Sequence, residues 1–393
     1  MWNWLTLLIA LLALPAYAHK PSDSYLTINI TNDVITGQWD IALRDLDYAL
    51  GLDDNADNQI TWGELKHHQA TVVAYSLARL ALNTDANLCT TQLSDYLVDQ
   101  HSDGYYAVLR FSAMCPIKPE QLTVDYRLFF DLDPTHRGLL NVNQDSEQQT
   151  AIFSPEQPRQ QILLNESNAW LSFKQFVEEG VWHIWIGYDH ILFLISLLLP
   201  SVVFRNGRQW LPVIAVKSAF LEVAKVVTAF TLAHSITLSL AALGWLDLPS
   251  RWVESAIAAS VLLAALNNIS PYVTQKLWLA AFAFGLIHGL GFASVLNDLG
   301  VNGKYLLVNL VGFNVGVELG QFVIVAIFFP FAYLARHSWY YQRLTLNFGS
   351  LIIAVIASFW LLDRSMALGW SESLARFNAF SGSVSEYLPF FNT

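Results

Sequence analysis

Charged side chains are scarce in this 393-residue chain, because only 13% of its residues are Asp, Glu, Lys or Arg. With a mean hydropathy of +0.38, this scarcity excludes a purely soluble protein. Positive charge is the scarcer sign, with 21 Lys and Arg against 32 Asp and Glu. An acidic surface repels phosphates, so the shortage of positive charge argues against nucleic acid as a partner.

Cysteine is also rare, and Cys89 and Cys115 are the only two in the chain. Both lie in the part that we expect to be exported to an oxidising compartment, where disulfides persist. A Cys89–Cys115 disulfide is therefore expected. It would close a loop of about 25 residues and contribute roughly 3 kcal/mol in the loop-entropy model. The alternative is a pair of buried free thiols.

The N-terminal segment has no Lys or Arg before its apolar run, Leu5–Leu14. That run is too short to span a bilayer, and Ala16 and Ala18 are the small residues of a signal-peptidase site. Residues 1–18 are therefore predicted to be a signal peptide. Positions 19–180 carry 23 acidic and 10 basic residues, whereas the rest of the chain carries 9 and 11. The acidic charge is thus concentrated in the exported part.

Residues 19–165 are predicted to form an exported β-sandwich-like domain with a helical insertion. β-branched and aromatic residues alternate along five stretches, Tyr25–Ile30, Val34–Ile41, Tyr105–Phe111, Leu122–Phe130 and Ile152–Leu163. The pattern between Leu43 and Leu82 is helical. Residues 166–180 are expected to be an amphipathic linker to the membrane. The predicted fold class is thus a multi-domain α/β membrane protein, with this domain followed by a six-helix transmembrane bundle.

An acidic loop at residues 53–64 has the spacing of an EF-hand calcium site. Oxygen ligands at these offsets can surround Ca²⁺, with the last residue bidentate. The expected ligands are Asp53, Asn55, Asp57, Gln59 through its backbone carbonyl, Thr61 and Glu64. Helical patterns flank the loop at Trp39–Leu50 and Gly63–Leu82, so the insertion is predicted to be EF-hand-like. The alternative is an acidic turn that binds nothing.

Six apolar stretches follow, each long enough for the roughly 20 residues of a transmembrane helix. They lie at about 181–203, 219–245, 252–272, 277–297, 305–334 and 344–367. Export of the N-terminal domain fixes the first span as outside to inside, and most Lys and Arg of the loops then fall inside, as the positive-inside rule requires. The membrane domain is assigned to 181–368, and residues 369–393 are predicted to be an exported tail.

Ionisable residues recur inside these apolar stretches, where they are usually functional. The candidate metal ligands are His183, Asp189, His190, His234, Glu254, His288 and Glu318. Histidines on three different spans fall at similar depth in the outer half of the membrane. Imidazole and carboxylate groups suit Ni²⁺, Co²⁺ or Zn²⁺. On a straight helix, His183 and His190 share a face but lie about 10 Å apart, too far to bind one ion. Asp189 has two possible roles, as a ligand or as the acceptor that orients a ligating histidine.

At these residues the chain resembles the HupE/UreJ family of nickel and cobalt permeases. The resemblance covers about 180–365 and rests on four motifs, His183-x5-Asp189-His190, Phe230-Thr-Leu-Ala-His234-Ser235-Ile-Thr, Phe284-Gly-Leu-Ile-His288-Gly-Leu-Gly-Phe-Ala293 and Asn314-x3-Glu318. The trailing Glu of the family's Phe-His-Gly-x-Ala-x-Glu signature is missing after His288. The resemblance implies a multi-pass protein of a bacterial inner membrane, with divalent nickel as cargo and the N-terminal domain on the periplasmic side.

We therefore expect a transporter that takes a divalent transition metal from outside through Asp189, His190, His234 and His288. Two alternatives belong to other classes. One is an intramembrane zinc-dependent hydrolase with Ser235 or Glu254 as helper, favoured by the absence of a matching polar track toward the inner face. The other is a non-catalytic sensor or assembly factor, whose acidic domain recruits an exported partner protein. The expected partners are a metal ion and the lipid bilayer.

Overall fold

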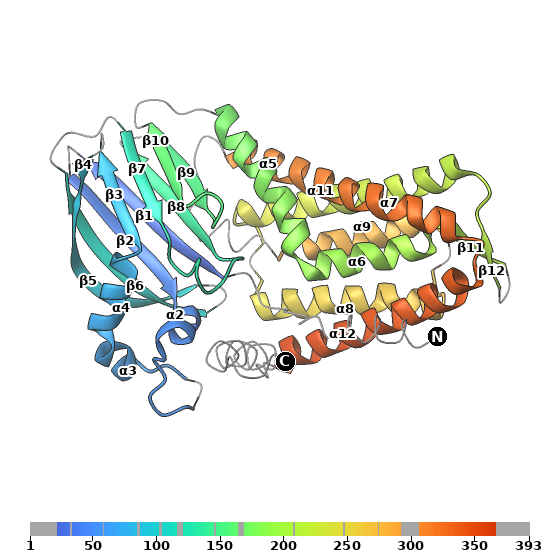
Figure 1. Ribbon diagram of the computed structural model, residues 1–393, viewed down its shortest axis with the longest axis horizontal. Helices are drawn as coiled ribbons and strands as arrows, with labels where there is room; N and C mark the ends of the chain where they lie inside the picture. Colours follow the sequence, from blue (N-terminus) through green and yellow to red (C-terminus); the bar gives the residue numbers. More distant parts are fainter. Residues whose placement is uncertain are drawn as a thin grey trace, which may run out of the picture.

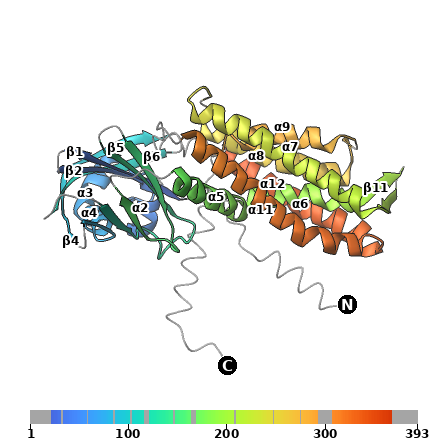
Figure 2. The same cartoon turned by 90° about the horizontal axis from the view of Figure 1, so that it is seen from above.

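The computed structural model describes residues 22–31, 34–57, 59–84, 87–101, 104–115, 121–144, 147–163, 169–206, 209–246, 248–273, 275–291 and 306–366. These residues form a β-rich part and a helical part, and both views place the β-rich part at one end of the helices (Figures 1 and 2). The predicted signal peptide, 1–18, and the predicted tail, 369–393, lie outside the described residues.

The larger sheet of the N-terminal part has six strands in the order β5-β6-β2-β1-β8-β9. Their bounds are β1 Asp23–Thr31, β2 Val34–Ala42, β5 Thr90–His101, β6 Gly104–Met114, β8 Arg137–Gln144 and β9 Glu147–Phe153. β1 pairs in parallel with β8, while the other neighbours are antiparallel. The sequence predicted β1, β2 and β6 with ends that differ from the structure by at most three residues, but it missed β5 and β8. The predicted stretch Ile152–Leu163 is wrong as a single strand, because β9 ends at Phe153 and residues 159–163 belong to a second sheet.

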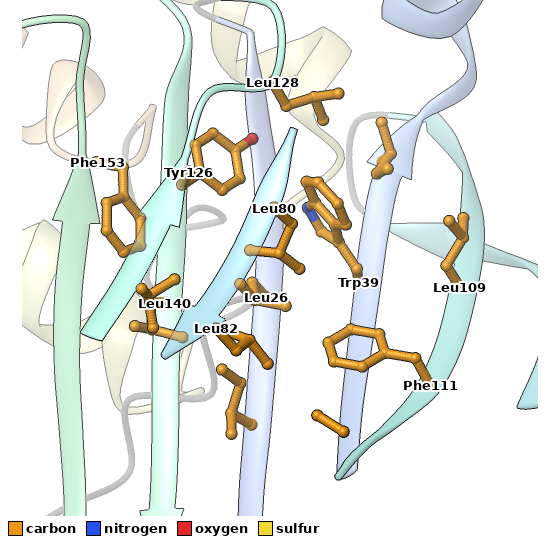
Figure 3. Packing of buried hydrophobic residues seen from close by; sticks show 14 of the residues in the cluster. Leu26, Trp39, Leu80, Leu82, Leu109, Phe111, Tyr126, Leu128, Leu140 and Phe153 are labelled. Carbon is orange, nitrogen blue, oxygen red and sulfur yellow. The ribbon is translucent and has the colours of Figure 1, made fainter. Parts of the chain in front are cut away.

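A second sheet has the order β10-β7-β3-β4. Its strands are β3 Leu80–Thr84, β4 Asn87–Leu88, β7 Gln121–Tyr126 and β10 Arg159–Leu163. Side chains from both sheets share one apolar core, in which Trp39 and Leu109 of the larger sheet meet Leu82 and Tyr126 of the smaller (Figure 3). Along β3, the alternate residues Leu80 and Leu82 enter this core because strand side chains alternate between faces.

The insertion between β2 and β3 contains three short helices, α2 Leu43–Leu50, α3 Trp62–His67 and α4 Gln69–Leu77. The sequence placed helix at Trp39–Leu50 and at Gly63–Leu82, which is wrong at both outer edges. Residues Trp39–Ala42 belong to β2, where Trp39 pairs with Leu109 of β6, and Leu80–Leu82 belong to β3. Pairing with neighbouring strands therefore overrides the local helical pattern at both ends.

Cys89 and Cys115 form the expected disulfide, with their sulfur atoms 2.02 Å apart. Cys89 follows β4 and Cys115 follows β6, so the bond joins segments of the two different sheets. Cys89 is buried in the shared core. The disulfide therefore connects the two layers of the β-rich part.

A buried polar network lies beside this core. His136 contacts the Ser22 hydroxyl through Nδ1 at 2.5 Å and the Tyr126 hydroxyl through Nε2 at 2.6 Å. Tyr126 in turn lies 2.6 Å from the Ser24 hydroxyl, which accepts from the Trp39 indole at 3.2 Å. Burial lowers the pKa of His136 to about 4, although the charges of Asp45 and Asp133 act in the opposite direction.

The helical part begins with α5 Ala169–Ile186, which starts within the stretch expected to be a linker. The further elements are α6 Tyr188–Leu198, η1 Leu199–Val202, β11 Val203–Asn206, β12 Gln209–Pro212, α7 Val216–Ala242, α8 Ser250–Ile269, α9 Leu277–His288, α11 Leu306–Ala335, η2 Tyr340–Thr345 and α12 Leu346–Met366. The β11–β12 hairpin lies at the end of the helices away from the two sheets (Figure 1).

Four helices of the described chain are long and apolar enough to cross a membrane, and α5 with α6 makes a fifth if the bent pair is one span. The first expected span, 181–203, is therefore not one straight helix. α5 and α6 meet at a bend of 72°. In the fourth expected span, 277–297, α9 ends at His288, and residues 292–297 lie outside the described chain. The complete six-helix bundle stays a prediction.

Glycines allow two helix pairs to approach closely. A Cβ atom on Gly316 of α11 would collide with the backbone of Val177 in α5, and one on Gly180 of α5 would collide with Phe313. In the same way, Gly285 and Gly289 bring α9 against α7, where added Cβ atoms would meet the carbonyls of Phe230 and His234. Small residues at helix contacts are typical of packing in lipid.

The β-rich part contacts the helical part through α5. Tyr25, Tyr106 and Leu139, on the outer face of the larger sheet, belong to one apolar cluster with Phe176 of α5. Polar contacts join α5 to both sheets, because Arg137 of β8 lies 3.9 Å from Glu179 and the Gln175 amide donates to Gln160 of β10 at 2.9 Å. α5 therefore extends from the sheets into the helices.

Candidate metal centre

A break in the helix at Gly187 brings His183 and His190 together. His183 lies in the last turn of α5 and His190 in the first turn of α6, on either side of the 72° bend. Their ring centroids are 4.7 Å apart. The expectation that these two histidines are too far apart for one ion is therefore wrong, because it assumed a straight helix. A Cβ atom on Gly187 would stand 2.8 Å from both the His183 carbonyl and the His190 ring.

Asp189 holds the ring of His190. Its Oδ1 atom accepts from Nδ1–H of His190 at 3.0 Å and from the backbone N–H of the same residue at 2.9 Å. The proton on Nδ1 leaves the lone pair on Nε2, which is buried and has no hydrogen-bond partner. Carboxylates orient ligating histidines in this way in metal sites. The geometry thus gives Asp189 the orienting role.

His234 of α7 completes a group of three histidines. Candidate ligand atoms of His183, His190 and His234 lie within 4.8 Å of one another. His234 is fully buried, and the Asn314 side chain of α11 can pair with only one of its two ring nitrogens, which leaves the other without a hydrogen-bond partner. Leaving buried polar atoms unpaired is costly, so nitrogen atoms of this kind suit a bound cation.

His288 lies beside this group at the end of α9, with its ring centroid 5.0 Å from that of His190. Its Nε2 atom is 2.8 Å from the Ser260 hydroxyl, which itself donates to the carbonyl of Ile257 at 2.7 Å. We therefore assign the His288 proton to Nε2, which leaves the lone pair on the buried, unpartnered Nδ1. Phe193 and Phe230 cover the ring.

The structure places the two expected glutamates outside the histidine group. Glu254 accepts from Ser250 at 2.7 Å and lies 4.0 Å from Arg364 of α12. Arg364 is also 3.8 Å from Asp189, so it stands between the two carboxylates. Glu318 accepts from Thr228 at 3.0 Å, and the exposure of Thr228 puts this pair at the outer edge of the α7–α11 contact.

Polar contacts continue from the histidines along α7 toward the β11–β12 hairpin. The Thr231 hydroxyl is 3.0 Å from the side-chain oxygen of Gln321 on α11, and both residues are buried. Thr228 and Glu318 follow one turn further along α7. The sequence argument missed this track because Thr and Gln carry no charge that marks them in an apolar span. Ser235 donates to the carbonyl of Thr231 within its own helix, at 2.7 Å.

Comparison with known proteins assigns this helical region. The family model described as HupE / UreJ protein matches residues 159–364, more than half of the chain. The chain belongs to the HupE/UreJ family. No curated protein matches the chain.

Membership in the HupE/UreJ family and the apolar helices indicate a multi-pass membrane protein related to nickel and cobalt transport. The matched range includes the histidines of the candidate site together with Asp189 and Arg364; the four histidines are His183, His190, His234 and His288. Phe292 and Ala293, which end the motif around His288, lie outside the described residues. The disulfide and the acidic loop of the β-rich part precede the range that matches the HupE/UreJ model.

The acidic loop is closed by its own side chains. Glu64 accepts from the backbone N–H groups of Thr61 at 2.8 Å and Asp54 at 3.2 Å, and Thr61 and Glu64 form a capping box at the start of α3. The hydrogen bond from the Thr61 hydroxyl is the main cause that lowers the pKa of Glu64. Asn55 and Asp57 bond within the loop, where Asp57 N–H donates to Asn55 at 2.9 Å. Calcium binding by Asp53, Asn55, Asp57, Gln59, Thr61 and Glu64 stays a prediction.

Proposed function

We propose that this protein carries a divalent transition-metal ion across the membrane, with nickel or cobalt as cargo and zinc as a further ion of the same ligand chemistry. The observation that carries the proposal is the group of His183, His190 and His234, brought together by the bend at Gly187. Among the biological divalent cations, imidazole nitrogens suit the transition-metal ions. Family membership supports the same class of cargo.

The polar contacts that continue from the histidines along α7 toward the β11–β12 hairpin favour transport over hydrolysis. A transporter needs polar groups on both sides of its binding site, and the Thr231–Gln321 contact supplies them on the side away from the β-rich part. A hydrolase needs an acid or base beside the metal. Ser235 is engaged with its own helix and Glu254 with Ser250, so neither faces the histidines as such a helper.

In the proposed arrangement, His183, His190 and His234 hold the cation and Asp189 fixes the ring of His190. His288 lies close enough to His190 to receive the ion or to complete its shell. The N-terminal domain is proposed to face the periplasm of a bacterial inner membrane, which puts the β11–β12 hairpin with Arg205 on the inner side, in keeping with the positive-inside rule.

Ion uptake into proteoliposomes that contain the purified full-length chain tests the proposal. His190→Ala removes an oriented ligand and should reduce uptake of Ni²⁺ and Co²⁺ at least about tenfold, since loss of a mere orienting partner already weakens metal sites by that factor. His337→Ala is the matched control, because His337 is exposed in the turn after α11. Flux of Ni²⁺, Co²⁺ and Zn²⁺ that is the same in His190→Ala as in the parent chain contradicts the proposal.

A further inference from the structure

A second group of metal-type ligands lies in the exported part, beside the acidic loop. Asp54, which occupies a position that the EF-hand pattern does not use, accepts from Nε2–H of His68 at 2.9 Å. His67 stands next to it, with the two imidazole rings at 85° and their centroids 5.1 Å apart. Candidate ligand atoms of Asp54, His67 and His68 lie within 4.8 Å of one another.

The local fold explains why these three side chains meet. α3 ends at His67, and His68, with φ −86° and ψ 5°, separates it from α4. Consecutive residues of a regular helix point about 100° apart, and this junction instead leaves both rings beside the loop. The loop is held from its other side, because Asp54 N–H donates to Glu64 at 3.2 Å. This hydrogen bond within the protein holds Asp54 next to His68, so a metal ion is not needed to bring the two residues together.

The donor set selects the class of ion. Two imidazole nitrogens and one carboxylate oxygen suit Ni²⁺, Co²⁺ or Zn²⁺, whereas Ca²⁺ takes oxygen ligands only. Asp54 and His67 are exposed and His68 is half-buried, so solvent reaches the group and can complete a coordination shell. We propose that Asp54, His67 and His68 form a transition-metal site in the exported domain, separate from the predicted calcium ligands.

The role of such a site follows from its position and rests on the proposed transport function. An acidic domain raises the local concentration of cations around itself. A solvent-exposed site with three protein ligands exchanges its ion more readily than a buried one. It therefore acts as an acceptor that collects the same divalent ion that the histidines between the helices are proposed to carry.

Equilibrium binding of Ni²⁺ to the tag-free full-length chain in detergent tests the site, with a fluorescent chelator as competitor. The parent chain should bind two Ni²⁺ ions of different affinity. The double variant His67→Ala with His68→Ala should lose the exported site, weakened at least about tenfold, and keep the other. His190→Ala should lose the site between the helices and keep the exported site. The two variants therefore distinguish a failure of the exported site from a failure of the transport site.

Two further variants keep the result interpretable. Asp54→Asn preserves the size of the side chain, so weaker Ni²⁺ binding in this variant supports the site without a change in fold. Lys66→Ala, an exposed change in the same helix, should bind Ni²⁺ like the parent. Unchanged binding in the double histidine variant overturns the proposal. So does displacement of the exported Ni²⁺ by millimolar Ca²⁺ in both the parent and the double variant, which would assign the ion to the loop carboxylates.

Discussion

Gly187 lies at the bend between α5 and α6, with His183 in the turn before it and His190 in the turn after it. The sequence shows a seven-residue spacing, and a straight helix converts that spacing into two turns. The structure replaces the straight helix with a 72° bend, and the site of the bend is a glycine whose missing Cβ leaves room for the His183 carbonyl and the His190 ring. The sequence therefore indicates these histidines as candidate ligands, whereas their closeness could not be predicted, because many glycines occur in unbent helices.

Gly187→Ala should weaken Ni²⁺ binding between the helices at least about tenfold, because the added methyl group displaces an oriented ligand ring. The matched control is Gly349→Ala on α12, where a Cβ atom would lie 3.8 Å from Leu199, an ordinary contact distance. Chelator competition with the purified chain measures both variants. Equal affinities for Ni²⁺ in the two variants would show that the bend does not position the histidines.

His136 is expected to make the stability of the β-rich domain depend on pH. Its pKa is about 4 when folded, against an ordinary value of 6.5, so the unfolded chain binds more protons between these two values. This contribution to stability is fully present above about pH 6.5 and falls as the pH drops toward 4, by up to about 1.4 kcal/mol per pH unit. Pulse proteolysis in urea, performed at pH 7 and pH 5, measures the domain's unfolding free energy.

The variant His136→Gln should reduce the difference between the two pH values, because the replacement does not titrate. His67→Gln, at an exposed position of the same domain, should leave that difference as it is in the parent. An equal loss of stability from pH 7 to pH 5 in the parent and in His136→Gln would rule out His136 as the group responsible.

At the scale of elements, the length of the apolar stretches predicted where helices occur but not how they end. The stretches that became α7, α8, α11 and α12 were long and apolar, and all four are helices of spanning length. α9 stops at His288, where Gly289 follows, and its contact with α7 depends on glycines that allow the backbones to touch. In the β-rich part, the sequence argument missed β5. Few of its residues are buried, so the strand lacks the alternation of apolar and polar residues that indicates a strand.

Gly289→Ala should separate α9 from α7, because the added methyl group would overlap the Thr237 hydroxyl and the His234 carbonyl. Overpacking of this kind destabilises a protein by about 1–3 kcal/mol and should also move His288 away from His190. Gly291→Ala is the control, since its Cβ would meet only the end of the flexible Ile257 side chain at 2.9 Å and the His288 carbonyl at 3.3 Å. Thermal unfolding in detergent should separate the two variants; equal melting temperatures would contradict the expectation.

For the whole molecule, the uneven charge of the chain predicted two parts of different character. Most of the acidic residues before position 180 belong to the β-rich part, and the apolar remainder is helical. The sequence also predicted the disulfide, because both cysteines fall in the part assigned to an oxidising compartment. How the two parts contact each other could not be predicted, since the sheet face that meets α5 presents ordinary apolar residues such as Leu139.

Loss of the disulfide should destabilise the β-rich domain alone. Replacing Cys89 and Cys115 together by serine removes a crosslink between the two sheets, and about 3 kcal/mol of stability should be lost with it. Hydrogen exchange of strand amides reports this loss, while amides of α7 and α11 serve as the internal control. Strand amides that stay as protected in the double variant as in the parent would show that the core holds the sheets together without the crosslink.

α5 joins two places that would otherwise be independent. Glu179, which lies 3.9 Å from Arg137 of the sheet, is four residues before His183, and a helical turn of about 5.4 Å separates them. When a cation binds more tightly with α5 in one position than in another, cation binding shifts the population of the molecule toward that position of α5. Thermodynamic reciprocity then requires that a ligand of the β-rich part that favours one position of α5 changes the affinity for the cation, and that the cation changes the affinity for this ligand by the same factor.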